Sequence, residues 1–232
     1  MDNLVFHNLY VQTEYNFLSS TISIKNLKKE LYRYVGSSIA IVDEAMHGAY
    51  KFYKACIEAN CKPIIGLKAK IYNDNIDNFI ILYAKDNDGY KNLMRISSEI
   101  QINKKNVNLE YLKENSKGII ACVPFFENEL KYYYDNHNMS YFEEVIKNYK
   151  NCFNELYLGL TLQVSNYNIR EIMNLSMNYD ILPVALHKVN MVKPEHLESY
   201  KILRCISKGL QNYDCSELEE NSYFESSEEL LD

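Results

Sequence analysis

Short apolar runs alternate with segments of helical periodicity along most of this chain. Runs rich in Ile, Val, Leu and aromatic residues that end at polar residues are typical of buried strands. They predict strands at residues 5–11, 39–42, 63–71, 79–84, 118–123, 156–162 and 183–189. Apolar residues at three- and four-residue steps predict helices within 24–35, 46–57, 90–100, 142–153 and 169–176.

This alternation of strands and helices indicates an α/β fold with a mostly parallel sheet. So many strand–helix units in 232 residues favour closure of the sheet into a barrel surrounded by helices. The length is sufficient for one domain with a sizeable core.

The segment 39–66 illustrates one such unit. The strand Ile39–Val42 ends at Asp43 and Glu44, and a second strand follows at Ile64–Gly66. An acidic loop after a strand is where barrel enzymes keep their catalytic residues. Between the two strands a helix is predicted from the apolar positions Met46, Ala49, Tyr53, Cys56 and Ile57.

The first strand places three polar side chains at every second position. Asn8, Tyr10 and Gln12 therefore point to the same face of the sheet, followed by Thr13-Glu14-Tyr15. Neutral amide and phenol groups are weak ligands for transition metals compared with imidazole. The spacing is that of a metal-binding strand, but the residue types are not.

These motifs resemble the PHP (polymerase and histidinol phosphatase) domain that opens the alpha subunit of bacterial DNA polymerase III. The resemblance runs from about Phe6 to Glu229 and has no exonuclease insertion, as in the uninterrupted type of subunit. It implies a distorted (β/α)7-type PHP barrel with mostly parallel strands and outer helices. The best-matching parts are Thr13–Tyr15, Lys51–Lys54, Lys62–Gly66 and Asp88–Leu93.

The family's metal ligands are largely replaced here, in a pattern similar to that of low-GC Gram-positive alpha subunits. The first-strand histidines correspond to Asn8, Tyr10 and Gln12, and a loop aspartate corresponds to Ser19. The resemblance thus implies a vestigial pocket that binds no metal and has no catalytic residue. Its expected members are Asn8, Tyr10, Gln12, Ser19, Asp43, Glu44, Lys68, Cys122, His187, Lys188 and Asn190.

Charged residues at the predicted strand ends suggest what replaced the metals. If Lys68 and Lys188 face Asp43 and Glu44, an internal salt-bridge cluster would offset the repulsion between the carboxylates. Tyr10 and Gln12 would hydrogen-bond to this cluster. The alternatives are separate solvated charges at the barrel rim, or a single metal ion on Asp43, Glu44 and His187.

Charge and hydropathy limit the classes of protein that the chain can represent. The net charge of −6 and the scattered lysines disfavour strong DNA binding by the chain alone. No apolar stretch is long enough for a membrane span, and the N-terminus is unlike a signal peptide, so a cytoplasmic location is expected. The six cysteines form no CxxC pair, which favours free thiols over a disulfide or zinc framework.

The C-terminal residues differ in composition from the rest. Residues 217–232 carry seven acidic residues and no basic one. We therefore expect a PHP barrel domain at residues 1–210 and, at 211–232, an acidic connector toward a polymerase body. An acidic docking peptide is the alternative.

The resemblance implies that the parent protein is a DNA-directed DNA polymerase of chromosomal replication that uses Mg²⁺. The chain itself is expected to be a non-catalytic scaffold without a cofactor. Its expected partners are the thumb and palm of the polymerase, and other replisome subunits are further candidates. Primed DNA is expected to bind only through the parent protein, and no contact with a membrane is expected. The alternatives are an active metal-dependent phosphoesterase or exonuclease, and an interaction module for replisome partners.

Overall fold

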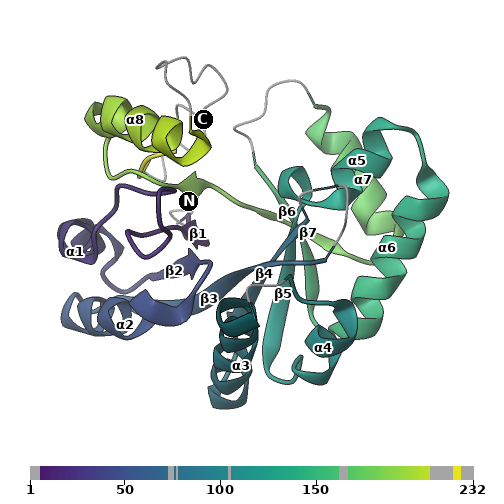
Figure 1. The fold of residues 1–232 in the computed structure, drawn as a ribbon, viewed down its shortest axis with the longest axis horizontal. Coiled ribbons are helices and arrows are strands. Elements are labelled where there is room, and N and C mark those ends of the chain that lie inside the picture. Colours follow the sequence, from purple (N-terminus) through teal and green to yellow (C-terminus); the bar gives the residue numbers. More distant parts are fainter. Residues whose placement is uncertain are drawn as a thin grey trace, which may run out of the picture. The chain divides into compact units, whose positions relative to one another are not determined.

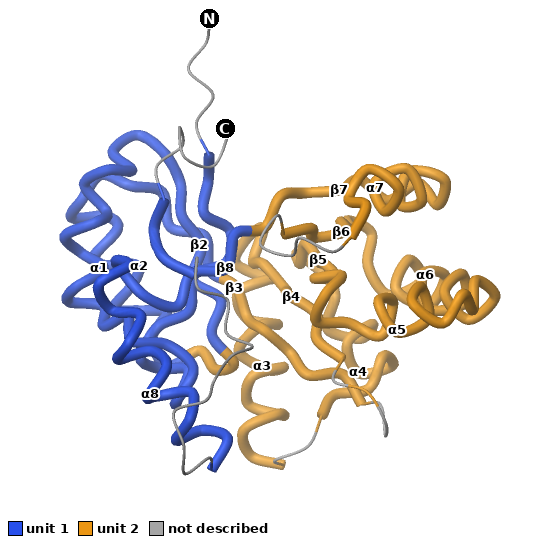
Figure 2. Tube along the Cα trace, turned by 90° about the horizontal axis from the view of Figure 1, so that it is seen from above, with its two compact units in different colours: residues 1–43, 47–65, 187–232 blue, residues 44–46, 66–186 orange. Residues whose placement is uncertain are grey.

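The chain folds into two compact units. The computed structural model describes residues 6–72, 76, 78–103, 106–161, 167–209 and 222–225. Unit 1 comprises residues 1–43, 47–65 and 187–232, and unit 2 comprises residues 44–46 and 66–186 (Figure 2). Each unit contains strands and helices of its own.

The strands of unit 1 have the order β2-β1-β8 and are parallel. Those of unit 2 have the order β3-β4-β5-β6-β7, and β3 begins in unit 1. Their bounds are β1 Tyr10–Val11, β2 Ser38–Asp43, β3 Lys62–Lys70, β4 Phe79–Ala84, β5 Ile119–Pro124, β6 Leu156–Leu160, β7 Leu182–Ala185 and β8 Lys188–Val189.

The predicted α/β class with mostly parallel strands is confirmed. The pairs β5–β6 and β6–β7 are parallel, whereas β4 is antiparallel to both of its neighbours. The residues described between β3 and β4 form no helix, and the link between the two strands is short. A parallel pair of consecutive strands requires a crossover connection, so the shorter link between these two strands produces the antiparallel pairing.

Two of the predicted strands differ from the observed ones. The run at 183–189 forms two strands because it changes partners, with β7 pairing with β6 and β8 pairing with β1. The first run is strand only at Tyr10–Val11, and residue 5 lies outside the described residues.

Helices α1 and α2 of unit 1 contribute side chains to an apolar core that also includes residues of its strands (Figure 1). Ser23 caps the first helix by accepting a hydrogen bond from the Asn26 backbone N–H at 3.2 Å. The core contains Leu27, Leu31, Ile39, Ile41 and Phe52. The helical segments are α1 Ile24–Leu31, η1 Tyr32–Tyr34, η2 Met46–Gly48, α2 Ala49–Glu58, η4 Pro194–His196 and α8 Leu197–Lys208, of which η2 begins in unit 2.

The buried face of α2 differs from the predicted one. Phe52 and Cys56 are fully buried, whereas Tyr53 and Ile57 are 48% and 55% exposed. The predicted face was therefore wrong by part of a turn, because Phe52 rather than Tyr53 contributes the large core side chain.

In unit 2, helices α5, α6 and α7 lie together on one side of the strands (Figure 1). The helices α4, α5 and α8 were not predicted from periodicity. No helix in the described ranges is long and apolar enough to cross a membrane. The helical segments are α3 Asn87–Asn103, α4 Leu109–Glu114, η3 Phe125–Glu127, α5 Glu129–Asp135, α6 Met139–Cys152 and α7 Ile169–Asn178.

The described cysteines mostly match the expectation of free thiols. Cys56, Cys61, Cys122 and Cys152 are free and buried. Cys205 is disulfide-bonded, so the prediction was wrong for Cys205. Spacing along the chain does not reveal a pair that only the fold brings together.

Four residues near the C-terminus pack into unit 1. The Ser222 carbonyl oxygen accepts hydrogen bonds from the backbone N–H groups of Asn190 and Met191, at 2.9 and 3.0 Å. The Phe224 side chain is 6% exposed and meets the Tyr34 ring edge-on, with 6.2 Å between the ring centroids. Residues 222–225 thus belong to the body of unit 1, and the remainder of the expected connector, 211–221 and 226–232, lies outside the described residues.

Replacing Phe224 with Ala tests this packing. We expect Phe224→Ala to lower the free energy of unfolding by about 3 kcal/mol, because it removes a large side chain from the core. Phe17→Ala is the control, since Phe17 is 83% exposed, and it should leave stability unchanged. Urea unfolding followed by circular dichroism provides the measurement, and equal effects of the two substitutions would show that Phe224 is not a core residue.

Candidate functional site

Asp43 lies at the end of β2 and binds the residues that follow β1. Its carboxylate accepts hydrogen bonds from the backbone N–H and the hydroxyl of Thr13, both at 2.6 Å. Both residues are buried, at 1% and 0% exposed. Short hydrogen bonds to a carboxylate are among the stronger ones in proteins, so this contact joins the carboxyl ends of β1 and β2.

The close approach of α2 to this contact requires a glycine. A Cβ atom on Gly48 would lie 2.7 Å from the Tyr15 ring and 3.4 Å from Asp43 Oδ2. Gly48 precedes α2, so the absence of its side chain lets the helix begin directly beside Tyr15 and Asp43.

Polar side chains line neighbouring positions of β1 and β8. Tyr10 pairs with Lys188 across the two strands, and the Lys188 ammonium is 5.7 Å from the centroid of the Tyr10 ring. Among the residues that the structure describes, the buried side-chain nitrogen of Gln12 has no hydrogen-bond partner, and neither has the side-chain oxygen of Asn190. The side-chain nitrogen of Asn190 donates to the Tyr200 hydroxyl at 2.9 Å.

A serine that sequence analysis did not single out connects these strands. The Ser20 hydroxyl lies 2.8 Å from the Gln12 carbonyl oxygen and 2.9 Å from that of Asn190. The hydroxyl of the predicted Ser19 makes longer contacts, accepting from Arg204 Nη1 at 3.4 Å and donating to the Phe17 carbonyl oxygen at 3.5 Å. Adjacent serines in a loop carry no periodic signal, so their sequence could not distinguish between them.

Asn8 and His187 also make hydrogen bonds inside unit 1. The Asn8 amide nitrogen donates to the hydroxyl of Tyr34, and burial raises the pKa of Tyr34 to about 12. The His187 Nε2 lies 2.7 Å from the Tyr223 carbonyl oxygen, so this nitrogen carries the proton. A protonated ring nitrogen has no lone pair for a metal ion.

In unit 2, Lys68 of β3 forms a salt bridge with Glu127. The two side chains are 6% and 21% exposed, and the Lys68 ammonium lies 4.1 Å from the centroid of the Phe79 ring. Glu127 belongs to η3, directly after β5. Sequence analysis missed Glu127, although an acidic residue just after a predicted strand was an available signal.

A buried polar network fixes the chain next to Glu127. The Asn128 amide nitrogen donates to Asn78 Oδ1 at 2.6 Å and to the Tyr149 hydroxyl at 3.1 Å. The Tyr149 hydroxyl donates to Glu129 at 3.2 Å, and Asn128 Oδ1 caps α5 by accepting from the Leu130 N–H. Because the buried groups satisfy one another, the network holds the start of α5 in place.

The other two predicted members in unit 2 differ in environment. Glu44 is exposed, and its carbonyl oxygen accepts a 3.2 Å hydrogen bond from Gln101. Cys122 is buried, and burial raises the pKa of its thiol to about 12. Its thiol is therefore protonated and unreactive at neutral pH.

The predicted vestigial pocket thus has eight members in unit 1 and three, Glu44, Lys68 and Cys122, in unit 2. The structure assigns Lys68 a partner, Glu127, that the expected salt-bridge cluster did not include. The wider cluster with Asp43, Glu44 and Lys188 stays a prediction, as does the pocket as a whole.

Asn8, Tyr10, Gln12 and Lys68, at four of the positions where the resemblance implies metal ligands, do not fit a multinuclear metal centre. They offer amides, a phenol and an ammonium group, while Asp43 binds Thr13. Among the described residues, no group of three or more His, Cys, Asp or Glu side chains could hold a metal ion. Amide and phenol oxygens are weak ligands for the transition metals that imidazole sites bind.

Breaking the Lys68–Glu127 pair is expected to destabilise the protein. Lys68→Ala should lower the free energy of unfolding by about 3–5 kcal/mol, since it leaves the Glu127 carboxylate partly buried without its cation. Lys28→Ala is the matched control, because it breaks the exposed Lys28–Glu58 pair and should leave stability unchanged. An unchanged melting temperature for Lys68→Ala, measured by circular dichroism, would contradict this role.

The Asp43–Thr13 contact can be tested in the same way. Asp43→Ala should cost about 3 kcal/mol because it removes the acceptor of two buried hydrogen bonds, and Thr13→Val, which removes one, should cost about half as much. Glu44→Ala, at the exposed neighbouring position, should have no effect. If Asp43→Ala and Glu44→Ala gave the same unfolding midpoint in urea, the contact would not be stabilising.

Comparison with known proteins identifies long relatives of this chain. It is 29% identical over 229 residues to the DNA polymerase III subunit alpha of Aquifex aeolicus, covering 87% of this chain and 20% of the relative. It is 26% identical over 261 residues to that of Helicobacter pylori, covering 99% of this chain and 21% of the relative. The chain therefore spans about a fifth of the length of these relatives.

A solved structure shows the same fold. The likeness is to an amidohydrolase from Chromobacterium violaceum with bound sulfate and no metal, with a TM-score of 0.56 and 8% sequence identity. It covers 80% of this chain and 87% of the other. At this identity the likeness concerns the fold alone, and it agrees with the expected PHP-type α/β architecture.

The family model for the PHP domain matches residues 8–165. That range includes the carboxyl ends of β1 and β2 and the strands β3 to β6. The match covers more than half of the chain, and the resemblance inferred from its motifs is confirmed: the chain belongs to the PHP domain family.

Proposed function

We propose that this chain is the PHP domain of a bacterial replicative DNA polymerase III alpha subunit and acts there as a scaffold without a metal ion. The observation that best supports this proposal is the similarity to DNA polymerase III alpha subunits over 87% and 99% of the chain. The chain spans only about a fifth of the length of those subunits. A scaffold role agrees with the residues at the implied metal positions.

Several of those residues make contacts that stabilise their own unit. Asp43 binds Thr13, His187 binds Tyr223, and Lys68 pairs with Glu127. The Lys68 ammonium group provides a fixed positive charge beside the Glu127 carboxylate. The proposed site thus replaces metal binding by internal hydrogen bonds and an ion pair.

In this proposal the polymerase activity belongs to the remainder of the parent protein. The parent would extend primed DNA with deoxynucleoside triphosphates and Mg²⁺ in the cytoplasm. The PHP domain would pack against the thumb and palm and stabilise their arrangement. It would contact DNA only through the parent.

A chimera tests the scaffold function directly. The N-terminal fifth of the Helicobacter pylori alpha subunit is exchanged for this chain, and extension of a primed template is measured after heating. We expect the chimera to polymerise, and Lys68→Ala to shorten its half-life at elevated temperature while Lys28→Ala leaves it unchanged. Loss of Lys68 should weaken the domain on which the polymerase region depends.

The metal-free part of the proposal has a separate test. The purified chain is dialysed against Mn²⁺ and Zn²⁺, analysed for bound metal and assayed with bis-p-nitrophenyl phosphate. We expect substoichiometric metal and no hydrolysis. Two or more bound equivalents with hydrolysis would instead support a phosphoesterase, and an inactive chimera would overturn the scaffold role.

A further inference from the structure

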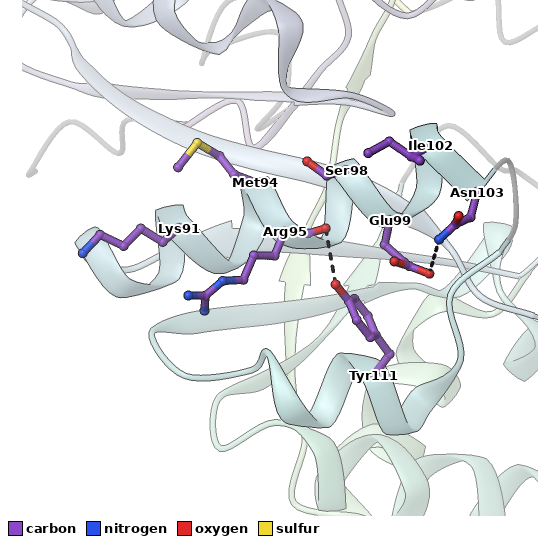
Figure 3. Close-up of a pocket in the computed structure, with 8 residues that line it drawn as sticks. All are labelled: Lys91, Met94, Arg95, Ser98, Glu99, Ile102, Asn103 and Tyr111. Carbon is purple, nitrogen blue, oxygen red and sulfur yellow. Dashed lines mark hydrogen bonds between the residues drawn. The ribbon is translucent and has the colours of Figure 1, made fainter.

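Helix α3 and the side chain of Tyr111 from α4 form an open groove of about 490 Å³ on unit 2 (Figure 3). Met94, Ser98 and Ile102 follow one another at four-residue steps along one side of α3. A second row at the same spacing contains Lys91, Arg95, Glu99 and Asn103. The groove therefore combines an apolar row with a row that is basic at one end.

Packing of α3 against the rest of unit 2 does not explain the side chains that line this groove. The buried residues of α3 are Gly89, Asn92, Leu93, Ile96 and Ser97, which lie on other positions of the helix. Met94 is 40% exposed and Ile102 is 78% exposed. Like charges four residues apart, as in Lys91 and Arg95, slightly destabilise a helix, so helix stability does not explain them.

The acidic groups near this surface already have partners. Asp88 forms a salt bridge with Lys117 at 2.8 Å, and Glu99 accepts a 2.6 Å hydrogen bond from Asn103. Arg95 donates to Asn92 Oδ1 at 2.7 Å, a neutral acceptor. Within the described ranges, neither Lys91 nor Arg95 has a carboxylate partner, which leaves both positive charges available to a ligand.

We propose that this groove binds an acidic segment with aliphatic side chains from a partner protein. Lys91 and Arg95 would pair with its carboxylates, and Met94 and Ile102 would cover its leucine or isoleucine side chains. Ser98 lies between these two apolar residues and is small enough to admit a close approach. Met, Arg and Tyr are enriched at protein interfaces, and all three line this groove.

The same features disfavour a nucleic acid as the ligand. A phosphate backbone gains little from the apolar side chains of Met94 and Ile102. An amphipathic peptide helix can instead present apolar and acidic residues side by side, at the three- and four-residue spacing that matches the two rows of α3.

The test uses a fluorescein-labelled helical peptide, AELEALLEELEA, and a charge-reversed version in which each Glu is Lys. We expect fluorescence anisotropy to show saturable binding of the acidic peptide to the full chain, and no binding of the basic one. The double variants Lys91→Glu/Arg95→Glu and Met94→Ser/Ile102→Ser should each weaken binding by roughly tenfold or more. All four substituted side chains are exposed, so circular dichroism should show unchanged folding.

Lys25→Glu/Lys29→Glu is the matched control, because it reverses two exposed lysines four residues apart on α1. It should leave peptide binding unchanged. If the control weakened peptide binding as much as Lys91→Glu/Arg95→Glu, the effect would reflect net charge alone and the proposal would be overturned. Absence of binding of the acidic peptide at about 1 mM would also overturn it. Binding of an oligothymidylate that depends on Lys91 and Arg95 but not on Met94 and Ile102 would identify a nucleic-acid site instead.

Discussion

The structure depends on the requirement that a buried carboxylate be satisfied. Asp43 lies at the end of a strand of unit 1, where it is 1% exposed, and an unpaired charge at such a depth would be costly. The Thr13 backbone N–H and hydroxyl meet it at 2.6 Å. Thr13 directly precedes the loop that leaves β1, so its hydrogen bonds to the Asp43 carboxylate also set the path of that loop. At the other end of the loop, the Ser20 hydroxyl donates to the Gln12 carbonyl oxygen.

Unit 2 meets the same requirement with an ion pair. Lys68 is 6% exposed and lies against the Phe79 ring, so its charge is largely removed from water. Glu127 provides the compensating charge, and the network around Asn128 and Tyr149 holds the following helix in place. An ion pair of this kind contributes little net stability compared with an apolar pair, but loss of one partner is costly. The Lys68–Glu127 pair therefore keeps β3 and η3 in their positions, because a substitution of either residue would be costly.

Much of the fold could be predicted from local patterns, and much of the site could not. Apolar runs identified β2 to β6 to within a few residues because a buried strand needs a continuous apolar sequence. The division of 183–189 into two strands escaped prediction, since a change of pairing partner leaves no mark on an apolar run. Hydrophobic periodicity does not identify the partners of Ser20 and Glu127, because Asn190 and Lys68 are distant from them in sequence; for Glu127 its place after a predicted strand was the one local signal.

The family resemblance was recognised from residues that do not bind metal, and this has a physical basis. Gly48 permits the approach of α2 to Tyr15, and Thr13 satisfies Asp43, so these positions are constrained by packing whether or not a metal is bound. Ligand positions are constrained by packing only to the extent that their side chains are buried. Asn8, Tyr10 and Gln12 can lie in or beside β1 without disturbing its pairing, because backbone groups make bonds such as that from the Gln12 N–H to the Val189 carbonyl oxygen. A fold of this type can therefore lose its metal chemistry and keep its architecture, which is the condition that a scaffold domain requires.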